Sequence, residues 1–396
     1  MIDVAGKTVM PGLIDAHGHI DCCYNTGVVP QKQPKRYAAL AFGVTTNFDP
    51  YPNELTSYES TETTLAGITV GPRWIGTGAV IYGRAQKSDF VYAPIDTYAD
   101  AQHILARKQA LGGISIKSYK QPARRQRQML VKAAREAGIN VVVEGESHFY
   151  NDITMILDGH TNLEHNLPLA NYYDDVVQFL GRAQAHNTPT LIVTFGELFG
   201  ENYMYQTTQA WNDPKIRAYV QETISGYSPL GTPPGAPPYA RGMTSIHAAE
   251  EIYDIGFRSV ARATKKLDDA GVIINVGSHG QVAGIAEHWE MWLLSQGGMS
   301  NFHVLRAATI NGASSLGVDD QIGSLQEGKL ADLIVLDANP LEDIHNTNTV
   351  RYTMVNGRLY DSMTMNEIGN YDRPRGKFYW ELRDNNGIDW NEAWGG

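Results

Sequence analysis

The chain has 396 residues, of which 42% are hydrophobic and 19% are charged, and its net charge at pH 7 is −11. This composition can form a large core, and the length fits either two or three domains or one α/β barrel with an accessory unit. The acidic balance, without a basic stripe, excludes nucleic acid as the main partner. No apolar run is long enough to span a bilayer, so we expect no membrane span.

Residues 1–9 have the pattern of a strand end followed by a turn, without an earlier strand to pair with. We therefore expect this sequence to belong to a longer protein, whose upstream strands complete a small β unit.

The most informative motif covers residues 11–19, PGLIDAHGH, at the end of a strand predicted over 9–15. Side chains alternate along an extended strand, so His17 and His19 point the same way. Gly18 between them allows a close approach of the backbone. Two converging imidazoles are a ligand pair for a transition metal. A lone HxH is more often part of a polar loop, but the apolar approach and the residues downstream favour a metal site.

Segments with strand-like and helix-like patterns alternate from this motif to residue 310. The predicted strands are 9–15, 43–48, 73–82, 113–119, 139–143, 161–163, 189–195 and 272–276. The predicted helices are 33–42, 97–111, 124–137, 153–157, 174–185 and 248–270. This alternation predicts a parallel sheet, and roughly eight βα units predict a closed (β/α)8 TIM barrel of the α/β class. We place the barrel over residues 9–322.

Polar side chains fall at or just past the carboxyl ends of these strands, the end that carries the chemistry in such barrels. They are His17, His19, Lys117, Glu144, His165 and His279.

Residues 196–245 interrupt the alternation with a segment rich in Tyr, Gly and Pro. Because it follows a strand, we expect a lid or substrate wall over the catalytic face, with a surface excursion as the alternative. Tyr203 and Tyr239 of this segment, together with Tyr119 and His247, are the candidate substrate-binding residues. For His247 a packing role is favoured over a substrate contact.

Residues 323–360 have the pattern of short strands, with turns at Glu327-Gly328 and Asn356-Gly357. Together with residues 1–8 they predict a small flanking β-sandwich that lacks its first strands. Residues 361–396 form an aromatic and polar C-terminal tail with no predicted function.

Five segments together resemble the amidohydrolase superfamily of metal-dependent hydrolases: 9–19, 43–47, 162–166, 307–316 and 323–337. The sequence is more similar still to amidohydrolase domains that follow a TolB-like β-propeller, which are imidazolonepropionase-like and prolidase-like. The resemblance implies a (β/α)8 barrel with one or two divalent metal ions and a flanking β-sandwich. It also implies an N-terminal propeller in the full-length protein and an exported or periplasmic location, with the cytoplasm as the alternative.

The family pattern implies metal ligands at His17 and His19 on strand 1, at Lys117 on strand 4, where the lysine is often carboxylated, and at His165 on strand 6. Two positions depart from the pattern. Glu144 stands where the strand 5 histidine is expected, and His279 stands where the strand 8 aspartate is expected.

Both departures leave alternatives open. A carboxylate can replace an imidazole as a zinc ligand, so Glu144 remains a candidate ligand. Lys117 is then either a carboxylated ligand or an ammonium paired with Glu144 or Glu146. His279 is either a ligand or the general base, because its pKa lies near neutral pH, and we favour a base next to the metal.

These features predict a hydrolase that cleaves the amide bond of a small substrate, such as a dipeptide, an N-acyl amino acid or a cyclic amide, with metal-activated water. We expect one or two Zn²⁺ ions, with Mn²⁺, Co²⁺ or Fe²⁺ as alternatives, and a homo-oligomer. The alternatives are a hydrolase of esters, lactones or phosphotriesters, and a non-catalytic metal- or ligand-binding module of a larger protein with a propeller.

Overall fold

The computed structural model describes residues 2–20, 32–82, 95–119, 121, 123–144, 148–193, 200–208, 210–220, 249–378 and 381. Tyr239, His247 and Glu146, which the sequence analysis named, lie outside these ranges. Among the described helices, none combines the length and the apolar character that a bilayer crossing needs.

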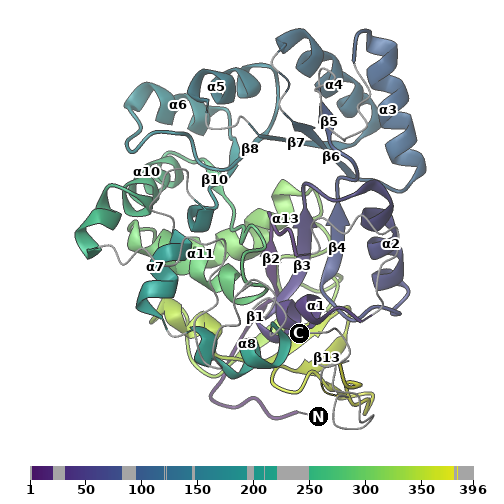
Figure 1. The fold of residues 1–396 in the computed structure, drawn as a ribbon, viewed down its shortest axis with the longest axis vertical. Coiled ribbons are helices and arrows are strands. Elements are labelled where there is room, and N and C mark those ends of the chain that lie inside the picture. The colour runs from purple at the N-terminus through teal and green to yellow at the C-terminus, as the bar shows by residue number, and fades with distance from the viewer. Residues whose placement is uncertain are drawn as a thin grey trace, which may run out of the picture.

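Two parallel sheets form the body of the molecule (Figure 1). The first consists of β2 (Leu13–Asp15), β3 (Val44–Asp49) and β4 (Arg73–Gly76). The second consists of β5 (Ile81–Tyr82), β6 (Ser115–Tyr119), β7 (Asn140–Glu144), β8 (Asn162–Glu164), β9 (His186–Thr188) and β10 (Ile273–Ile274).

The two sheets join at both edges. β4 pairs with β3 and β5 pairs with β6, so β4 and β5 act as two halves of one interrupted strand. At the other edge, the Ala16 N–H after β2 donates to the Val276 carbonyl after β10, at 2.9 Å. The predicted (β/α)8 barrel is therefore confirmed.

Helices pack around the barrel (Figure 1). They are α1 (Pro34–Ala41), α2 (Glu54–Leu65), α3 (Tyr98–Ala110), α4 (Arg124–Ala137), α5 (Phe149–Leu157), α6 (Asp174–Arg182), α10 (Phe257–Asp269), α11 (Ile285–Gln296) and α12 (Asn301–Arg306). The last helix, α13 (Gly312–Ser315), contacts β2 and contributes Ala313 to the apolar cluster inside the barrel. The sequence explains their ends locally: a capping box between Thr97 and Asp100 starts α3, and Gly138, at φ +67°, ends α4. The helix predicted over 124–137 is confirmed at both ends.

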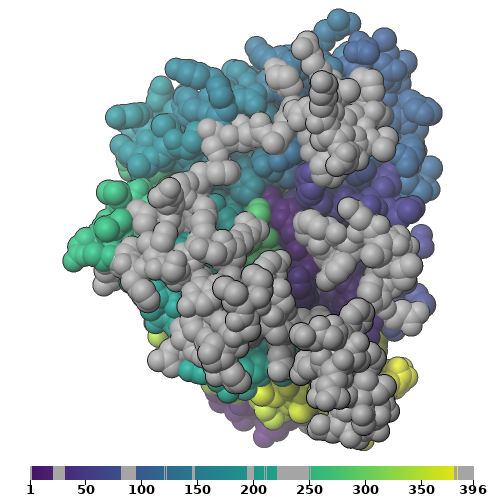
Figure 2. All heavy atoms as spheres, viewed as in Figure 1, coloured from purple at the N-terminus to yellow at the C-terminus, as the bar shows by residue number. Residues whose placement is uncertain are grey.

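The short helical turns are η1 (Leu191–Val193), η2 (Ala210–Asn212), η4 (Glu250–Asp254), η6 (Ile344–Asn348) and a π-helical turn, η5 (Ala307–Asn311). In the space-filling view the segment from α3 to α6 forms the upper part of the molecule (Figure 2).

A separate five-stranded antiparallel sheet lies at the lower end of the molecule in Figure 1. Its order is β1 (Thr8–Pro11), β11 (Leu333–Leu336), β12 (Val350–Val355), β13 (Arg358–Asp361) and β14 (Glu367–Ile368). This sheet occupies the place of the predicted small β unit, and β14 extends it beyond residue 360, into the predicted tail.

The strand predicted over 9–15 is two strands in different sheets, which is a correction. β1 pairs with β11, whereas β2 pairs with β3. The break falls at Gly12, where a Cβ would lie 2.1 Å from the Thr45 hydroxyl oxygen. The chain thus leaves the smaller sheet and enters the barrel at Gly12, and residues 9–11 belong to the smaller sheet.

Two other predicted elements are wrong. The strand predicted over 189–195 lies earlier, as β9, because Thr190 has φ +49°, which a strand does not accommodate. The segment after it forms the η1 turn. The helix predicted over 248–270 is divided into η4 and α10 at Gly256, where ψ is −129°.

The described part of the predicted lid contains α7 (Gly200–Thr207) and α8 (Pro214–Tyr219). In α8 the Lys215 ammonium donates to the Ala41 and Val350 carbonyls, at 2.9 and 3.0 Å. α8 is therefore fixed against α1 and the antiparallel sheet rather than over the catalytic face.

An apolar cluster fills the barrel interior. Its members are Ile14, Phe48, Ile75 and Val142 from four strands, with Ala313, Leu316 and Ile322 from the segment around α13. The polar side chains of these strands lie beyond the apolar cluster, at the carboxyl ends of the strands.

Candidate metal centre

His17, which is buried, and His19, which is partly buried, lie side by side in the segment directly after β2. The Nε2 atoms of the two rings lie 3.1 Å apart. The Nδ1 atom of His17 lies 2.5 Å from a Glu164 carboxyl oxygen, and the Nδ1 atom of His19 lies 2.8 Å from one of Asp49. Carboxylates that hold the outer nitrogen of a histidine are the usual support of a metal-ligating imidazole.

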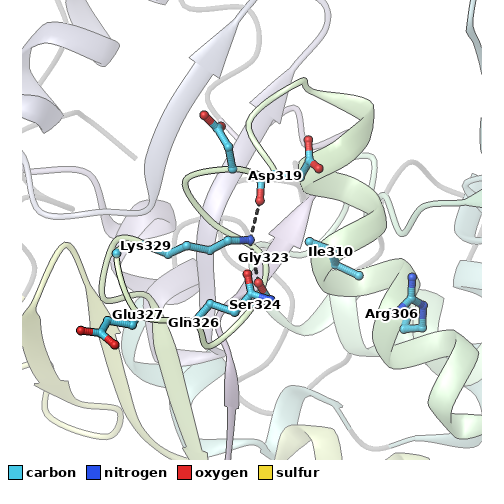
Figure 3. Close-up of a pocket in the computed structure, with 10 residues that line it drawn as sticks. Arg306, Ile310, Asp319, Gly323, Ser324, Gln326, Glu327 and Lys329 are labelled. Atoms are coloured by element: carbon cyan, nitrogen blue, oxygen red, sulfur yellow. Dashed lines mark hydrogen bonds between the residues drawn. The ribbon is translucent and has the colours of Figure 1, made fainter.

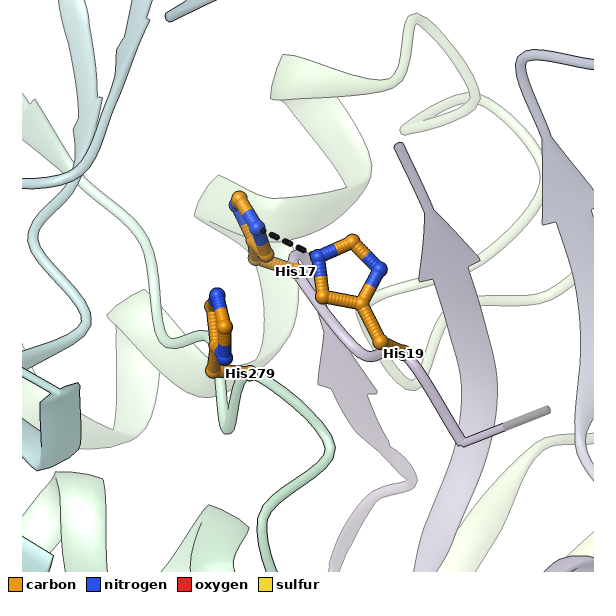
Figure 4. A group of neighbouring side chains, drawn as sticks. All are labelled: His17, His19 and His279. Carbon is orange, nitrogen blue, oxygen red and sulfur yellow. Dashed lines mark hydrogen bonds between the residues drawn. The ribbon is translucent and has the colours of Figure 1, made fainter. Parts of the chain in front are cut away.

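His279 joins this pair from the segment after β10 (Figure 4). Ring nitrogens of His17, His19 and His279 all lie within 4.8 Å of one another. The backbone of His279 has φ +55°, a sparsely populated conformation for a residue with a side chain, and its N–H donates to the His17 carbonyl at 2.7 Å. Strain of this kind collects at functional sites, where the surroundings hold it in place.

His165 is the fourth ring of the cluster, at 4.7 Å from the His17 ring and 5.4 Å from the His279 ring, between centroids. Its Nδ1 atom lies 2.6 Å from the Thr190 hydroxyl, which itself donates to the Pro189 carbonyl. The hydroxyl has only one proton, so it accepts from His165, and the Nε2 atom of His165 carries a lone pair. The φ of His165 is also positive, at +68°.

Close backbone packing fixes the segments that carry these rings. At Gly18 a Cβ would lie 2.2 Å from the Asn47 side-chain oxygen, and at Gly280 it would lie 2.6 Å from the His19 backbone. The role predicted for Gly18 is thereby confirmed. Asp15 connects the two segments, since it accepts from the Ser278 N–H and from the His17 N–H.

Two of the imidazoles, His17 and His165, are held in the neutral form that metal ligation requires. Burial, followed by the nearby positive charges of the other histidines and Lys117, lowers the pKa of His17 well below its usual value. Burial lowers the pKa of His165 to about 4. Burial also raises the pKa of Glu164 to about 8, and a cation beyond the His17 ring would offset that effect and favour the carboxylate.

Lys117 and Glu144 form an ion pair at the edge of the rings, with 2.6 Å between the ammonium and one carboxyl oxygen. The ammonium also lies over the rings of Tyr119 and Tyr51, at 4.9 and 5.7 Å from their centroids. The contact is the one expected for an ammonium paired with Glu144, and carboxylation of Lys117 stays the alternative prediction.

Glu144 faces the rings as a carboxylate. Burial acts to raise its pKa, but the charges of Lys117 and His165 outweigh burial, and the pKa is lowered. The same oxygen that binds Lys117 lies 3.8 Å from the Nε2 atom of His165. Burial, and then the charge of Glu144, raises the pKa of Tyr119, which keeps this phenol protonated next to the carboxylate.

The structure thus brings the six predicted metal-site residues together, with Tyr119 beside them. Tyr203 is different, because its ring packs against Tyr253 and Phe257 at 5.2 Å and under the Arg258 guanidinium. Tyr203 thus packs against η4 and α10, and its contact with a substrate stays a prediction.

Asp49, Tyr51 and Glu164 also lie at the site and were not predicted from the sequence. Asp49 ends β3 and Glu164 ends β8, so both obey the rule of polar residues at carboxyl ends of strands. Applying that rule to every predicted strand would have found them.

The structure also contains a pocket of 660 Å³ away from the imidazoles, lined by α12, η5 and residues 319–329 (Figure 3). A neighbouring pocket includes Ile273, at the start of β10, whereas His279 follows the end of that strand. The Lys329 ammonium donates to the Ser324 hydroxyl at 2.6 Å and to backbone carbonyls. Lys329 therefore supports the loop that carries it.

The fold and these side chains define a (β/α)8 barrel protein with a candidate metal centre at the carboxyl ends of its strands. The chain belongs to the amidohydrolase family, whose pattern it matches over residues 8–360. The predicted family resemblance is confirmed, and the upstream propeller stays a prediction.

Relatives of known name are similar over short stretches. The chain is 43% identical over 67 residues to the imidazolonepropionase of Picrophilus torridus, which covers 16% of this chain and 17% of that protein. It is 34% identical over 95 residues to the ochratoxinase of Aspergillus niger, which covers 23% of this chain and 20% of that protein. The matched stretches thus span a small part of these curated relatives.

The solved structure of a Xaa-Pro dipeptidase with bound methionine is similar over most of the chain. It matches with a TM-score of 0.65 and 20% identity, over 91% of this chain and 88% of that chain. At this identity the similarity shows the shared fold.

Proposed function

We propose that this protein is a hydrolase of carbon–nitrogen bonds in small molecules, and that His17, His19 and His279 bind one divalent ion, with Zn²⁺ as the first choice. Family membership supports the class of reaction. The arrangement of the three imidazoles supports the metal.

The observation that carries the proposal is the 3.1 Å distance between the Nε2 atoms of His17 and His19. Two lone pairs repel at this distance, so either a proton or a cation must lie between the rings. The opposite nitrogens are held by Glu164 and Asp49, which is the support that a ligated imidazole needs. Neutral imidazole is a preferred ligand of zinc.

An ion bound here would supply Lewis acidity toward a carbonyl oxygen and would lower the pKa of water. Glu144 is the residue that we assign to proton transfer, because it is ionised and faces the Nε2 atom of His165. It would take a proton from the attacking water and return it to the departing nitrogen, so that one water and one amide give an acid and an amine. Lys117 holds Glu144 in place for this step.

His279, predicted to be a base, is assigned here as a ligand. Its ring lies 4.9 Å from that of His19 and 5.2 Å from that of His17, between centroids, so one side of the ring faces the other imidazoles. A ring nitrogen bound to a metal has no lone pair left to accept a proton.

We infer that the substrate is a small amide, such as a dipeptide, an N-acyl amino acid or a cyclic amide. The names of the relatives support this class, since they include an imidazolonepropionase and a Xaa-Pro dipeptidase. Tyr51 and Tyr119, whose ring centroids lie 5.5 Å apart, supply an aromatic wall next to the ion pair.

The test is metal removal and reconstitution with a substrate panel. The protein is treated with a chelator, reloaded with Zn²⁺, Mn²⁺ or Co²⁺, and assayed on dipeptides, N-acyl amino acids, cyclic amides, esters, lactones and phosphotriesters. We expect one ion per chain by elemental analysis and metal-dependent turnover of an amide. His19→Ala should lose the ion, whereas His303→Ala, which removes an exposed histidine paired with Asp268, should retain it. A wild-type protein that binds no metal at saturating Zn²⁺ would refute the site, and turnover of esters alone would refute the substrate class.

A further inference from the structure

A chain of side-chain contacts connects His279 to α7, in the segment that follows β9. The Gln281 amide nitrogen donates to a Glu201 carboxyl oxygen at 2.5 Å. The Gln281 amide oxygen lies 3.3 Å from the Nδ1 atom of His279. Glu201 is buried, with 5% of its surface exposed, whereas Gln281 and His279 are partly exposed.

The direction of each contact follows from the chemistry of the three groups. A carboxylate accepts hydrogen bonds and an amide nitrogen only donates, so Glu201 selects the orientation in which the Gln281 amide oxygen faces His279. An amide oxygen only accepts, so the Nδ1 atom of His279 carries the proton. The Nε2 atom is then left with the lone pair, on the side of the ring away from Gln281.

The other two proposed ligands, His17 and His19, also have a partner at the Nδ1 atom, without an intervening amide. His17 and His19 each place the Nδ1 atom directly against a carboxyl oxygen, of Glu164 and Asp49 respectively. His279 contacts an amide instead, and an amide can present either end. The hydrogen bond from the Gln281 amide nitrogen to Glu201 favours the orientation in which the amide oxygen faces His279.

We propose that Glu201 is a positioning residue of the metal centre, which orients the Gln281 amide and thereby keeps the Nε2 atom of His279 available as the third ligand. This inference rests on the proposed metal site at His17, His19 and His279. Helix α7, which carries Glu201, would then help to position the third ligand of that site. Outer groups of this kind typically contribute 10- to 100-fold to metal affinity.

The test compares Glu201→Gln, Gln281→Leu and the double variant with the wild-type full chain. Glu201→Gln keeps the shape of the side chain but removes the group that only accepts. We expect each single variant to weaken Zn²⁺ binding by roughly 10- to 100-fold in competition with a chelator. Because the two residues act along one chain of contacts, the double variant should be no weaker than Gln281→Leu.

A spectroscopic readout separates positioning from general loss of structure. The visible absorption of the Co²⁺-loaded protein reports the ligands and their geometry, and ¹⁵N shifts of the histidine rings report which nitrogen carries the proton. We expect an altered Co²⁺ spectrum in both single variants, and mixed tautomers of one histidine in the metal-free Glu201→Gln protein.

The matched control is Gln128→Leu, which removes another amide that donates to a carboxylate, Asp158, on the outside of the barrel. Its Zn²⁺ affinity and Co²⁺ spectrum should equal those of the wild type. If Glu201→Gln does not fold, Gln281→Leu, at a partly exposed position, carries the test alone.

The outcomes distinguish this inference from the proposed function. A wild-type protein without a metal site refutes both. Wild-type binding that is lost in His19→Ala, together with wild-type affinity and an unchanged Co²⁺ spectrum in the folded variants at Glu201 and Gln281, refutes the positioning role alone.

Discussion

Asp15 accepts two hydrogen bonds from Ser278, one from the backbone N–H at 3.0 Å and one from the hydroxyl. Asp15 ends β2, which leads to His17 and His19, and Ser278 precedes His279. One buried contact thus sets the distance between the two segments that carry the proposed ligands. Burial raises the pKa of Asp15, while its hydrogen bonds with Ser278 act to lower it, so the carboxylate depends on Ser278.

Ser278→Ala should therefore weaken both folding and metal binding. Loss of a hydrogen bond to a buried charged group costs roughly 1.5–3 kcal/mol in the free energy of unfolding, measured with urea. Zn²⁺ affinity should fall as well, because the segments are no longer tied. Ser362→Ala is the control, since its buried hydroxyl donates to the Val350 carbonyl at the antiparallel sheet. The control should lose stability and keep its Zn²⁺ affinity, and an unchanged affinity in Ser278→Ala would contradict the argument.

Asp49→Asn should weaken Zn²⁺ binding without removing it. The amide oxygen can still accept from the Nδ1 atom of His19, but without the negative charge that strengthens the imidazole as a ligand, and we expect a loss of roughly 10-fold. Competition titrations of the metal-free protein give this value. Asp343→Asn, which changes an exposed carboxylate 2.8 Å from the Nδ1 atom of His345, should have no effect. Equal affinities for both variants and the wild type would show that the charge of Asp49 does not strengthen His19 as a ligand.

Metal loading should not depend on carbon dioxide. The Lys117 ammonium lies 2.6 Å from a Glu144 carboxyl oxygen. Because this ion pair stabilises the charged lysine, we expect that Lys117 is not carboxylated. Reconstitution in degassed buffer and in bicarbonate should give the same metal content, one ion per chain, by elemental analysis. A second ion that appears only with bicarbonate would instead indicate a carboxylated Lys117.

Lys117→Met should destabilise the fold, because the Glu144 carboxylate then loses its ion pair with Lys117. Breaking a buried pair by removing one partner costs roughly 3–5 kcal/mol, and because part of the Glu144 side chain is exposed, we expect less than that range. The double variant Lys117→Met/Glu144→Gln removes the unpaired charge and should recover part of the free energy of unfolding. A double variant as unstable as the sum of its singles would show that the two residues do not interact.

Glu287 should make the protein less stable as the pH rises. Its carboxyl group is fully buried, and its oxygens have no hydrogen-bond partner among the described residues. Burial, followed by the charges of Asp15 and Glu290, raises the pKa of Glu287 well above 4.5. The folded protein therefore holds a proton that the unfolded chain releases above pH 4.5, so the free energy of unfolding falls with pH from there through neutrality.

Glu287→Gln should remove this difference in bound protons between the folded and the unfolded protein. The slope of the unfolding free energy against pH should decrease by up to about 1.4 kcal/mol per pH unit between pH 5 and 8, as measured by urea unfolding. Glu62→Gln, at an exposed position, should leave the slope unchanged. An unchanged slope in Glu287→Gln would mean that this carboxyl is ionised in the folded protein.

Local patterns in the sequence determined much of the fold and of the metal centre. Helix α4 is amphipathic and is followed by a glycine, so both of its ends could be predicted from nearby residues. His17 and His19 are two residues apart at the end of a predicted strand, so their common direction could be predicted from strand alternation, although the strand itself ends at Asp15. The alternation of strand-like and helix-like segments predicted the barrel, and a barrel places polar residues from distant strands at one end.

Only the tertiary structure decided the contacts between those distant residues. The chain passes from one sheet to the other at Gly12, where a side chain would collide with Thr45 on a different strand. Whether Lys117 is a ligand or an ammonium depends on its distance to Glu144, and the tautomer of His279 depends on Gln281 and Glu201. The sequence by itself thus determined which residue types reach the mouth of the barrel. Hydrogen-bond direction and charge act over a few ångströms in space, so closure of the barrel decided what each residue can do there.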